Sequence, residues 1–163
     1  MLNSMRIIET KAYQFEELDE QTKEKAIDNY RHLGVYDDWY DFIKHDLKEV
    51  GIELRSFDID RASYAEIHID YFFETCEKII ETHGENCETY KIAERYIKEY
   101  NEIHQHIHDD DAIECLDEEY QKEFSEEVLS MLRREYEYMT SDEYVIEMFE
   151  ANEYEFTEEG KLI

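Results

Sequence analysis

The sequence predicts an α+β fold, in which a small antiparallel sheet of three to four strands packs against several helices. Three observations predict this class. Apolar and polar residues alternate over residues 52–71, which is typical of half-buried strands. Apolar residues recur at helical spacing from residue 72 onward, so the C-terminal two thirds are expected to be rich in helix. The 163 residues include no proline, so no proline interrupts these helices.

The first third of the chain predicts one strand and two helices. Residues 6–15 favour a strand. Asp19 predicts the N-cap of a helix, because its carboxylate can accept a hydrogen bond from the first helical turn, and Gly34 ends that helix. A second helix is expected over residues 37–50, closed by Gly51. Its apolar stripe consists of Trp39, Phe42, Ile43, Leu47 and Val50.

A hairpin is expected next. Residues 52–59 read as a strand whose alternation changes phase, which predicts a β-bulge near Ser56. Residues 64–71 alternate without interruption and form the second strand. One face of this hairpin should therefore be buried and the other exposed.

The remainder predicts helices followed by a short strand. Thr140 to Glu143 reads as a capping box that opens the last helix. Residues 154–156 are expected to form the final strand. No internal repeat and no linker rich in Gly, Pro or Ser is present, so residues 1–163 are expected to form a single domain. The four helices are expected over residues 72–84, 90–107, 116–136 and 140–151.

The net charge is the feature that bears most directly on function. The chain has 45 acidic and 17 basic residues, a net charge of −28, whereas solubility of a small domain needs a magnitude of only roughly 2 to 8. Residues 109–163 alone contain 20 acidic and 4 basic residues. Direct nucleic-acid binding is disfavoured, because phosphates are bound by cations. The charge predicts a basic protein as the partner.

Six carboxylates in the acidic C-terminal third are the candidate partner-binding residues. They lie between apolar positions of a predicted helix, where carboxylates at i, i+4 and i+7 align at about 5 to 6 Å per turn. That spacing is comparable to the spacing of phosphates along one DNA strand, so a rigid acidic helix can imitate a phosphate row. The alternative is a solvated helix face in a merely acidic protein. The six residues are Asp117, Glu118, Glu119, Glu123, Glu126 and Glu127.

No pattern in the chain predicts catalysis. There is no Gly-rich phosphate loop, G-x-S-x-G, H-E-x-x-H or C-x-x-C. We therefore expect no enzyme, no catalytic residue and no cofactor. The run from His104 to Asp111 is the strongest metal-like cluster, but alternate residues of a helix point about 200° apart, so we expect no metal there. A metal-dependent enzyme that uses this cluster stays an alternative.

Cysteine usage and hydropathy predict a cytoplasmic protein. The three cysteines fit neither a zinc module nor a disulfide framework, which favours a reducing compartment. The N-terminus lacks an apolar signal core, and no stretch approaches the roughly 18 apolar residues of a membrane span. We expect no membrane association.

Two blocks of the sequence resemble a known group of proteins. The first is YQFEEL at residues 13–18, followed by KEKAI at 23–27; the second comprises YEY at 136–138, SDE at 141–143 and EANEYEFTEEGK at 150–161. Both are similar to small acidic proteins of bacteriophages and prophages, mostly of Gram-positive hosts, which are often labelled antitoxin-like. Those proteins carry a glycine-rich stretch with tryptophan after the hairpin, where this chain has residues 72–107.

The resemblance implies a setting in which strong acidity has a use. Phages encode acidic proteins that occupy DNA-binding surfaces of host defence enzymes, including anti-CRISPR proteins and other DNA mimics. The expectation is an inhibitor, acting in the bacterial cytoplasm, that binds a basic nucleic-acid-binding surface, above all that of a CRISPR effector nuclease, and blocks DNA or guide engagement. An antitoxin that neutralises a basic toxin and a phage structural or replication accessory protein are the alternatives.

Overall fold

The chain divides into two compact units in the computed structural model, which describes residues 9–106 and 110–163. Unit 1 combines the first 37 residues with residues 136–163, and unit 2 comprises residues 38–135. Each unit has its own cluster of buried apolar side chains. Unit 2 therefore interrupts unit 1 in the sequence. That the chain folds as a single domain stays a prediction.

Unit 1 is built from both ends of the chain. Asp19 caps the first α-helix as predicted, because its carboxylate accepts a hydrogen bond of 2.9 Å from the backbone N–H of Thr22. The two short strands pair antiparallel, with Tyr13 opposite Phe156. The elements are β1 (Tyr13–Gln14), the 3-10 helix η1 (Phe15–Glu17), α1 (Glu20–Tyr30), α6 (Asp142–Ala151) and β4 (Glu155–Phe156).

Aromatic packing holds the two ends of the chain together in unit 1. Phe149 of α6 is almost fully buried, and its ring centroid lies 5.4 Å from that of Phe15 and 5.0 Å from that of Phe156. Tyr30 of α1 packs edge-on against the same ring at 6.3 Å. Edge-to-face pairs at such distances stabilise beyond the area they bury, so the core of unit 1 depends on residues distant in sequence.

Unit 2 contains a hairpin and most of the helical residues. Its core includes buried side chains of every one of its elements. Gly51, at φ +100°, closes the first of its helices as predicted and turns the chain directly into a strand. The elements are α2 (Asp41–Val50), β2 (Ile52–Asp58), β3 (Tyr64–Ile69), α3 (Phe72–Thr82), α4 (Glu88–His106) and α5 (Asp110–Met139), whose last residues belong to unit 1.

The β2–β3 hairpin has one buried and one exposed face. The register shifts between Leu54 and Ser56, which confirms the predicted bulge. Glu53 stands opposite His68 on the exposed face. The buried face consists of Ile52, Leu54, Ala65, Ile67 and Ile69.

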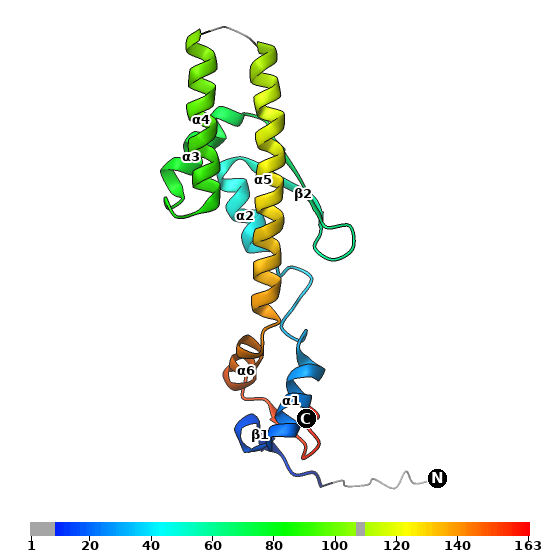
Figure 1. Ribbon diagram of the computed structural model, residues 1–163. Helices are drawn as coiled ribbons and strands as arrows, with labels where there is room; N and C mark the ends of the chain where they lie inside the picture. The colour runs from blue at the N-terminus through cyan, green and yellow to red at the C-terminus, as the bar shows by residue number, and fades with distance from the viewer. Residues whose placement is uncertain (1–8, 107–109) are drawn as a thin grey trace, which may run out of the picture. The chain divides into compact units, whose positions relative to one another are not determined.

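Helices α4 and α5 lie side by side in opposite directions (Figure 1). Side-chain hydrogen bonds join them from Tyr96 to Asp117 and from Tyr120 to Glu99, and Arg95 forms an ion pair with Glu123. One stripe of α5 faces the core, while the residues between face outward. The buried stripe consists of Leu116, Tyr120, Phe124, Val128 and Leu132.

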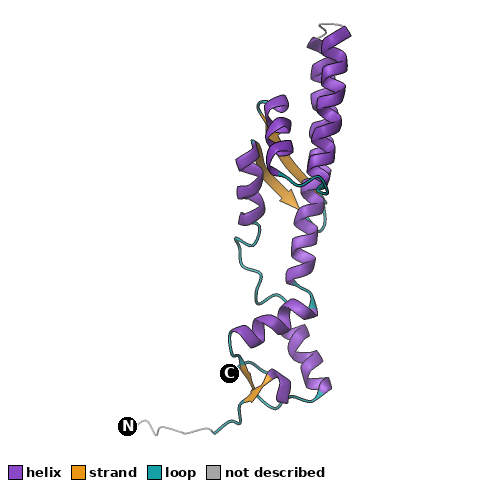
Figure 2. Cartoon of the chain, turned by 90° about the vertical axis from the view of Figure 1, so that its left-hand side faces the viewer, coloured by secondary structure: helices purple, strands orange, loops and turns teal. Residues whose placement is uncertain are grey.

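The helix-rich α+β class is confirmed, whereas the expected single sheet is not found. The four strands of the described residues form two separate two-stranded antiparallel sheets, β1–β4 and β2–β3 (Figure 2). The first strand pairs with the last one rather than joining the hairpin. It is also shorter than expected: residues 6–8 lie outside the described residues, and residues 9–12 belong to no strand.

The predicted apolar stripe of the second helix was wrong at two residues, since Trp39 precedes α2, which begins at Asp41, and Phe42 lies on the solvent side. Phe42 is 77 % exposed, whereas its neighbour Ile43 is buried. Consecutive residues of a helix point about 100° apart, and the buried stripe of Ile43, Leu47 and Val50 leaves Phe42 on the solvent side. None of the helices in the described part of the chain combines the length and apolarity that a membrane span requires.

Candidate functional site

All six predicted carboxylates lie on α5, in the part of the helix that packs on α4 through its opposite face. Leu116, Tyr120 and Phe124 anchor that face in the core of unit 2. The carboxylates lie between these anchors, as the sequence predicted. They differ, however, in what each contacts.

Three of the six have partners within unit 2. Asp117 is half-buried and accepts a hydrogen bond of 2.6 Å from the hydroxyl of Tyr96. Glu123 forms an ion pair with Arg95, and Glu127 forms one of 2.8 Å with Arg134. A paired carboxylate has to lose its internal partner, or share it, before it can bind an external cation in full. These three residues therefore contribute less external negative charge than the sequence alone suggests.

The environment of Asp117 also affects its protonation. Burial raises the pKa of Asp117, and the hydrogen bond from Tyr96 opposes this shift only in part. Burial and the same hydrogen bond raise the pKa of Tyr96, so its hydroxyl stays protonated and acts as the donor. The pair is a structural contact between two helices that also fixes one wall of the surface described below.

The other three carboxylates are exposed, but they do not form an unbroken row. Glu118, Glu119 and Glu126 have no ion-pair partner among the described residues. Lys122 lies one turn from Glu118 and one turn from Glu126, so the row at i, i+4 and i+8 alternates in sign. A continuous imitation of a phosphate row is therefore not present along these six residues.

The structure instead places carboxylates around a groove. The groove has a volume of about 450 Å³ and lies between α5 and the segment that joins β3 to α3. Four acidic side chains and one lysine contribute to its lining. Acidic residues outnumber the single lysine in this lining, so the groove as a whole favours cations. Its lining consists of Ile69, Asp70, Phe72, Glu114, Asp117, Glu118, Gln121, Lys122 and Ser125.

An exposed aromatic residue adjoins the acidic groove. Tyr71 lies between two lining residues, Asp70 and Phe72, and 71 % of its surface is exposed. Tyrosine is enriched among the residues that contribute most to protein interfaces.

Sequence reasoning identified only part of this groove. Asp117 and Glu118 were predicted as binding residues, whereas Asp70 and Glu114 were not. The alternation of the hairpin does place Asp70 on the exposed face, but nothing in the sequence brings that end of β3 beside α5. Glu114 lies one turn before Glu118 but is not among the six predicted residues.

The run from His104 to Asp111 shows no metal site in the part of it that is described. Its residues 107–109, which include His108 and Asp109, and the side chain of His106 lie outside the described part of the chain. Elsewhere in the described chain, no group of three His, Cys, Asp or Glu side chains is placed to hold a metal ion. This includes the four carboxylates of the acidic groove, which are not placed to hold a metal ion.

The cysteines are free thiols. Cys76 is buried, and burial raises the pKa of its thiol, which keeps it protonated. Cys87 and Cys115 are exposed. A protonated, buried thiol is a poor nucleophile, so Cys76 serves packing.

The chain matches none of the known proteins with which it was compared: no protein family, no curated protein and no solved structure. The resemblance of residues 13–27 and 136–161 to small phage proteins therefore stays an expectation. Both of these blocks lie in unit 1, whereas the acidic groove lies in unit 2.

Proposed function

We propose that this protein is a phage-encoded acidic inhibitor that acts in the cytoplasm of the bacterial host. It binds the basic nucleic-acid-binding surface of a host defence protein, with a CRISPR effector nuclease as the leading candidate, and blocks DNA or guide engagement. The observation that carries the proposal is the acidic groove, whose lining includes the exposed carboxylates Glu114 and Glu118 and residues on both sides of the exposed Tyr71 in the sequence.

The excess of carboxylates in the groove suits a cationic side chain. Nucleic-acid-binding surfaces present arginine and lysine, and arginine pairs with carboxylates through two parallel hydrogen bonds. Glu114 and Glu118 are exposed and one turn apart, with no ion-pair partner among the described residues, so their negative charge is available to a partner. Tyr71, exposed and next in sequence to two lining residues, is a candidate aromatic contact for the same partner.

The mechanism is occlusion with electrostatic attraction. A net charge of −28 accelerates the encounter with a basic protein over a distance of about one Debye length, roughly 8 to 10 Å at physiological salt. Short-range contacts at the acidic groove then hold the complex and cover the partner's cations. DNA or guide RNA, which needs the same cations, is excluded.

The test is capture followed by an activity assay. The immobilised full-length protein is exposed to lysate of a Gram-positive host, bound proteins are identified by mass spectrometry, and a captured nuclease is purified and assayed for DNA cleavage with and without the inhibitor. The proposal predicts capture of a basic nucleic-acid-binding protein. Inhibition of its DNA-cleaving activity should weaken as the salt concentration rises. Capture of a basic toxin whose toxicity the chain neutralises would assign it as an antitoxin instead. Capture of no basic protein would contradict both.

A further inference from the structure

A second groove in unit 2 differs in charge from the rest of the protein. It has a volume of about 840 Å³, and three of the chain's 17 basic residues line it: Lys44, Lys48 and Arg55. Two carboxylates, those of Glu53 and Asp70, also line it. In a chain of net charge −28, a groove with more cations than carboxylates is a local reversal of sign.

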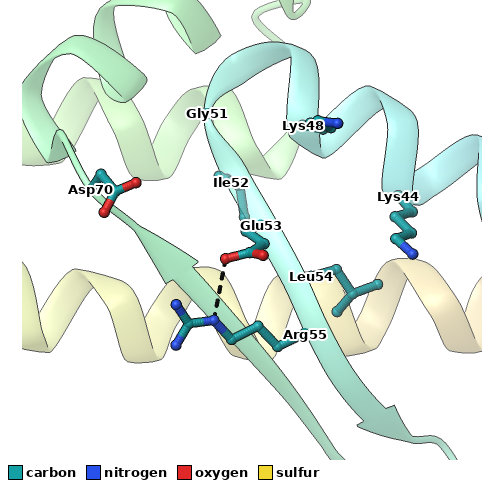
Figure 3. Close-up of a pocket in the computed structure, with 8 residues that line it drawn as sticks. All are labelled: Lys44, Lys48, Gly51, Ile52, Glu53, Leu54, Arg55 and Asp70. Carbon is teal, nitrogen blue, oxygen red and sulfur yellow. Dashed lines mark hydrogen bonds and ion pairs between the residues drawn. The ribbon is translucent and has the colours of Figure 1, made fainter.

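The lining shows that this basic groove follows the edge of a strand. Five consecutive residues, Gly51 to Arg55, contribute to it. Successive side chains of a strand point to opposite faces of the sheet, so a groove on either face alone would be lined by alternate residues. Figure 3 shows these residues beside α2, with the side chain of Lys44 reaching toward β2.

That edge has no strand partner among the described residues. In the described part of the chain, strand β2 pairs with β3 on one side only, and residues at the start of β2 line the groove together with Asp70, which follows β3. An unpaired edge presents backbone N–H and C=O groups that an extended peptide can pair with. The groove thus offers backbone hydrogen bonds and positive charge in the same place.

The spacing of the lysines matches an extended ligand. Lys44 and Lys48 are exposed, lie one turn apart on α2, and have no ion-pair partner among the described residues. One helical turn rises about 5.4 Å, and alternate residues of an extended strand are about 6.8 Å apart. Two carboxylates at alternate positions of an added strand can therefore each contact one lysine. A single small anion in so open a groove would contact the two lysines less fully.

We propose that the edge of β2, together with Lys44 and Lys48, binds an extended acidic peptide segment of a partner protein by strand addition. The peptide pairs with the backbone of residues 52–54, ahead of the bulge at Arg55, and its alternate carboxylates contact the two lysines. Arg55, which Glu53 already contacts at 3.2 Å, lies on the outer face and adds a weaker attraction. This inference does not rest on the proposed inhibitor function, although Asp70 lines both grooves.

The probe is a fluorescein-labelled peptide of sequence Val-Glu-Val-Glu-Val-Glu-Val, and binding to the full-length protein is followed by fluorescence anisotropy. The proposal predicts measurable binding that weakens by about tenfold or more in the variant Lys44→Glu/Lys48→Glu. The matched control is Lys78→Glu/Lys98→Glu, which changes the total charge equally at exposed lysines outside the groove. It should change the affinity by no more than about twofold. Circular dichroism confirms that both variants are folded.

Three results would overturn the proposal. One is the absence of binding by the unmodified protein, which would mean that the lysines only protect the edge from pairing. Another is an equal loss of affinity in both double variants, which would mean that the net charge of the protein, rather than the position of Lys44 and Lys48, determines binding. The third is undiminished binding of the same peptide after N-methylation of alternate backbone nitrogens. Because methylation removes the N–H donors, this result would mean that the groove binds the peptide's charges without strand addition.

Discussion

The hydroxyl of Tyr96 donates a hydrogen bond of 2.6 Å to the carboxylate of Asp117 and thereby links α4 to α5 at the wall of the acidic groove. Tyr96 is almost completely buried. Tyr96→Phe should lower the free energy of unfolding by about 1 to 3 kcal/mol, because it leaves a half-buried carboxylate without its donor. Denaturant unfolding measures the change.

Tyr90→Phe on the same helix is the control, since the Tyr90 hydroxyl has no hydrogen-bond partner among the described residues. It should change stability by less than about 0.5 kcal/mol. Equal losses in the two variants would contradict a specific role for the contact between Tyr96 and Asp117.

The raised pKa of Asp117 predicts a pH dependence. A carboxylate whose pKa is higher in the folded than in the unfolded state binds more protons when folded, so its contribution is most stabilising below its usual value of 3.8 and is lost as the pH rises through the folded-state pKa. Relative to Asp117→Asn, which does not titrate, the unmodified protein should gain stability as the pH falls toward that value. Unfolding free energies of both proteins across the acidic range measure the difference, and a difference that stays constant or shrinks would contradict the raised pKa.

Gly51 and Gly84 should respond differently to alanine. Gly51 has φ +100°, and an added Cβ would lie 2.7 Å from the Thr75 hydroxyl oxygen, so Gly51→Ala introduces both backbone strain and a close contact. We expect a loss of about 1 to 3 kcal/mol in the free energy of unfolding. Gly84 has no such conformation, and its nearest neighbour would be Cys87 Sγ at 4.0 Å. Gly84→Ala should be nearly neutral, and a similar cost at both positions would contradict the tight turn at Gly51.

Phe42 and Ile43 are adjacent on α2 but lie in opposite environments. Phe42 is mostly exposed, so Phe42→Ser should change the free energy of unfolding by less than about 0.5 kcal/mol. Ile43 is buried, and Ile43→Ala should cost about 2 to 5 kcal/mol through lost burial and the cavity left behind. Thermal or denaturant unfolding measures both. A large loss of unfolding free energy in Phe42→Ser would mean that Phe42 belongs to the buried stripe, as the sequence predicted.

Local signals in the sequence predicted much of the secondary structure. Asp19 caps α1 and Gly51 ends α2, because each acts on the backbone within one turn of itself. The phase change in residues 52–59 predicted the bulge for the same reason. The pairing of β1 with β4 was not predictable in this way, since Tyr13 and Phe156 meet only after the intervening chain has folded.

The candidate site was predicted in composition but not in geometry. Helical spacing places Asp117 and Glu118 on α5, yet it does not reveal that Tyr96 engages Asp117. It also cannot show that Asp70, from the end of β3, lines the same groove as Glu114. These relationships depend on how the hairpin and the helices pack together. The apolar pattern within a single segment carries no information about that packing.

The most direct test of the inhibitor proposal compares two matched charge reversals. Glu114→Lys/Glu118→Lys changes two exposed carboxylates one turn apart in the acidic groove, and Glu77→Lys/Glu81→Lys does the same on α3, outside that groove. The assay is inhibition of DNA cleavage by the captured nuclease at fixed salt. The account predicts that the first variant needs about tenfold or more protein for half-inhibition, while the second stays within about threefold of the unmodified protein. Equal inhibition by the two variants would contradict the assignment of the acidic groove as the partner-binding surface.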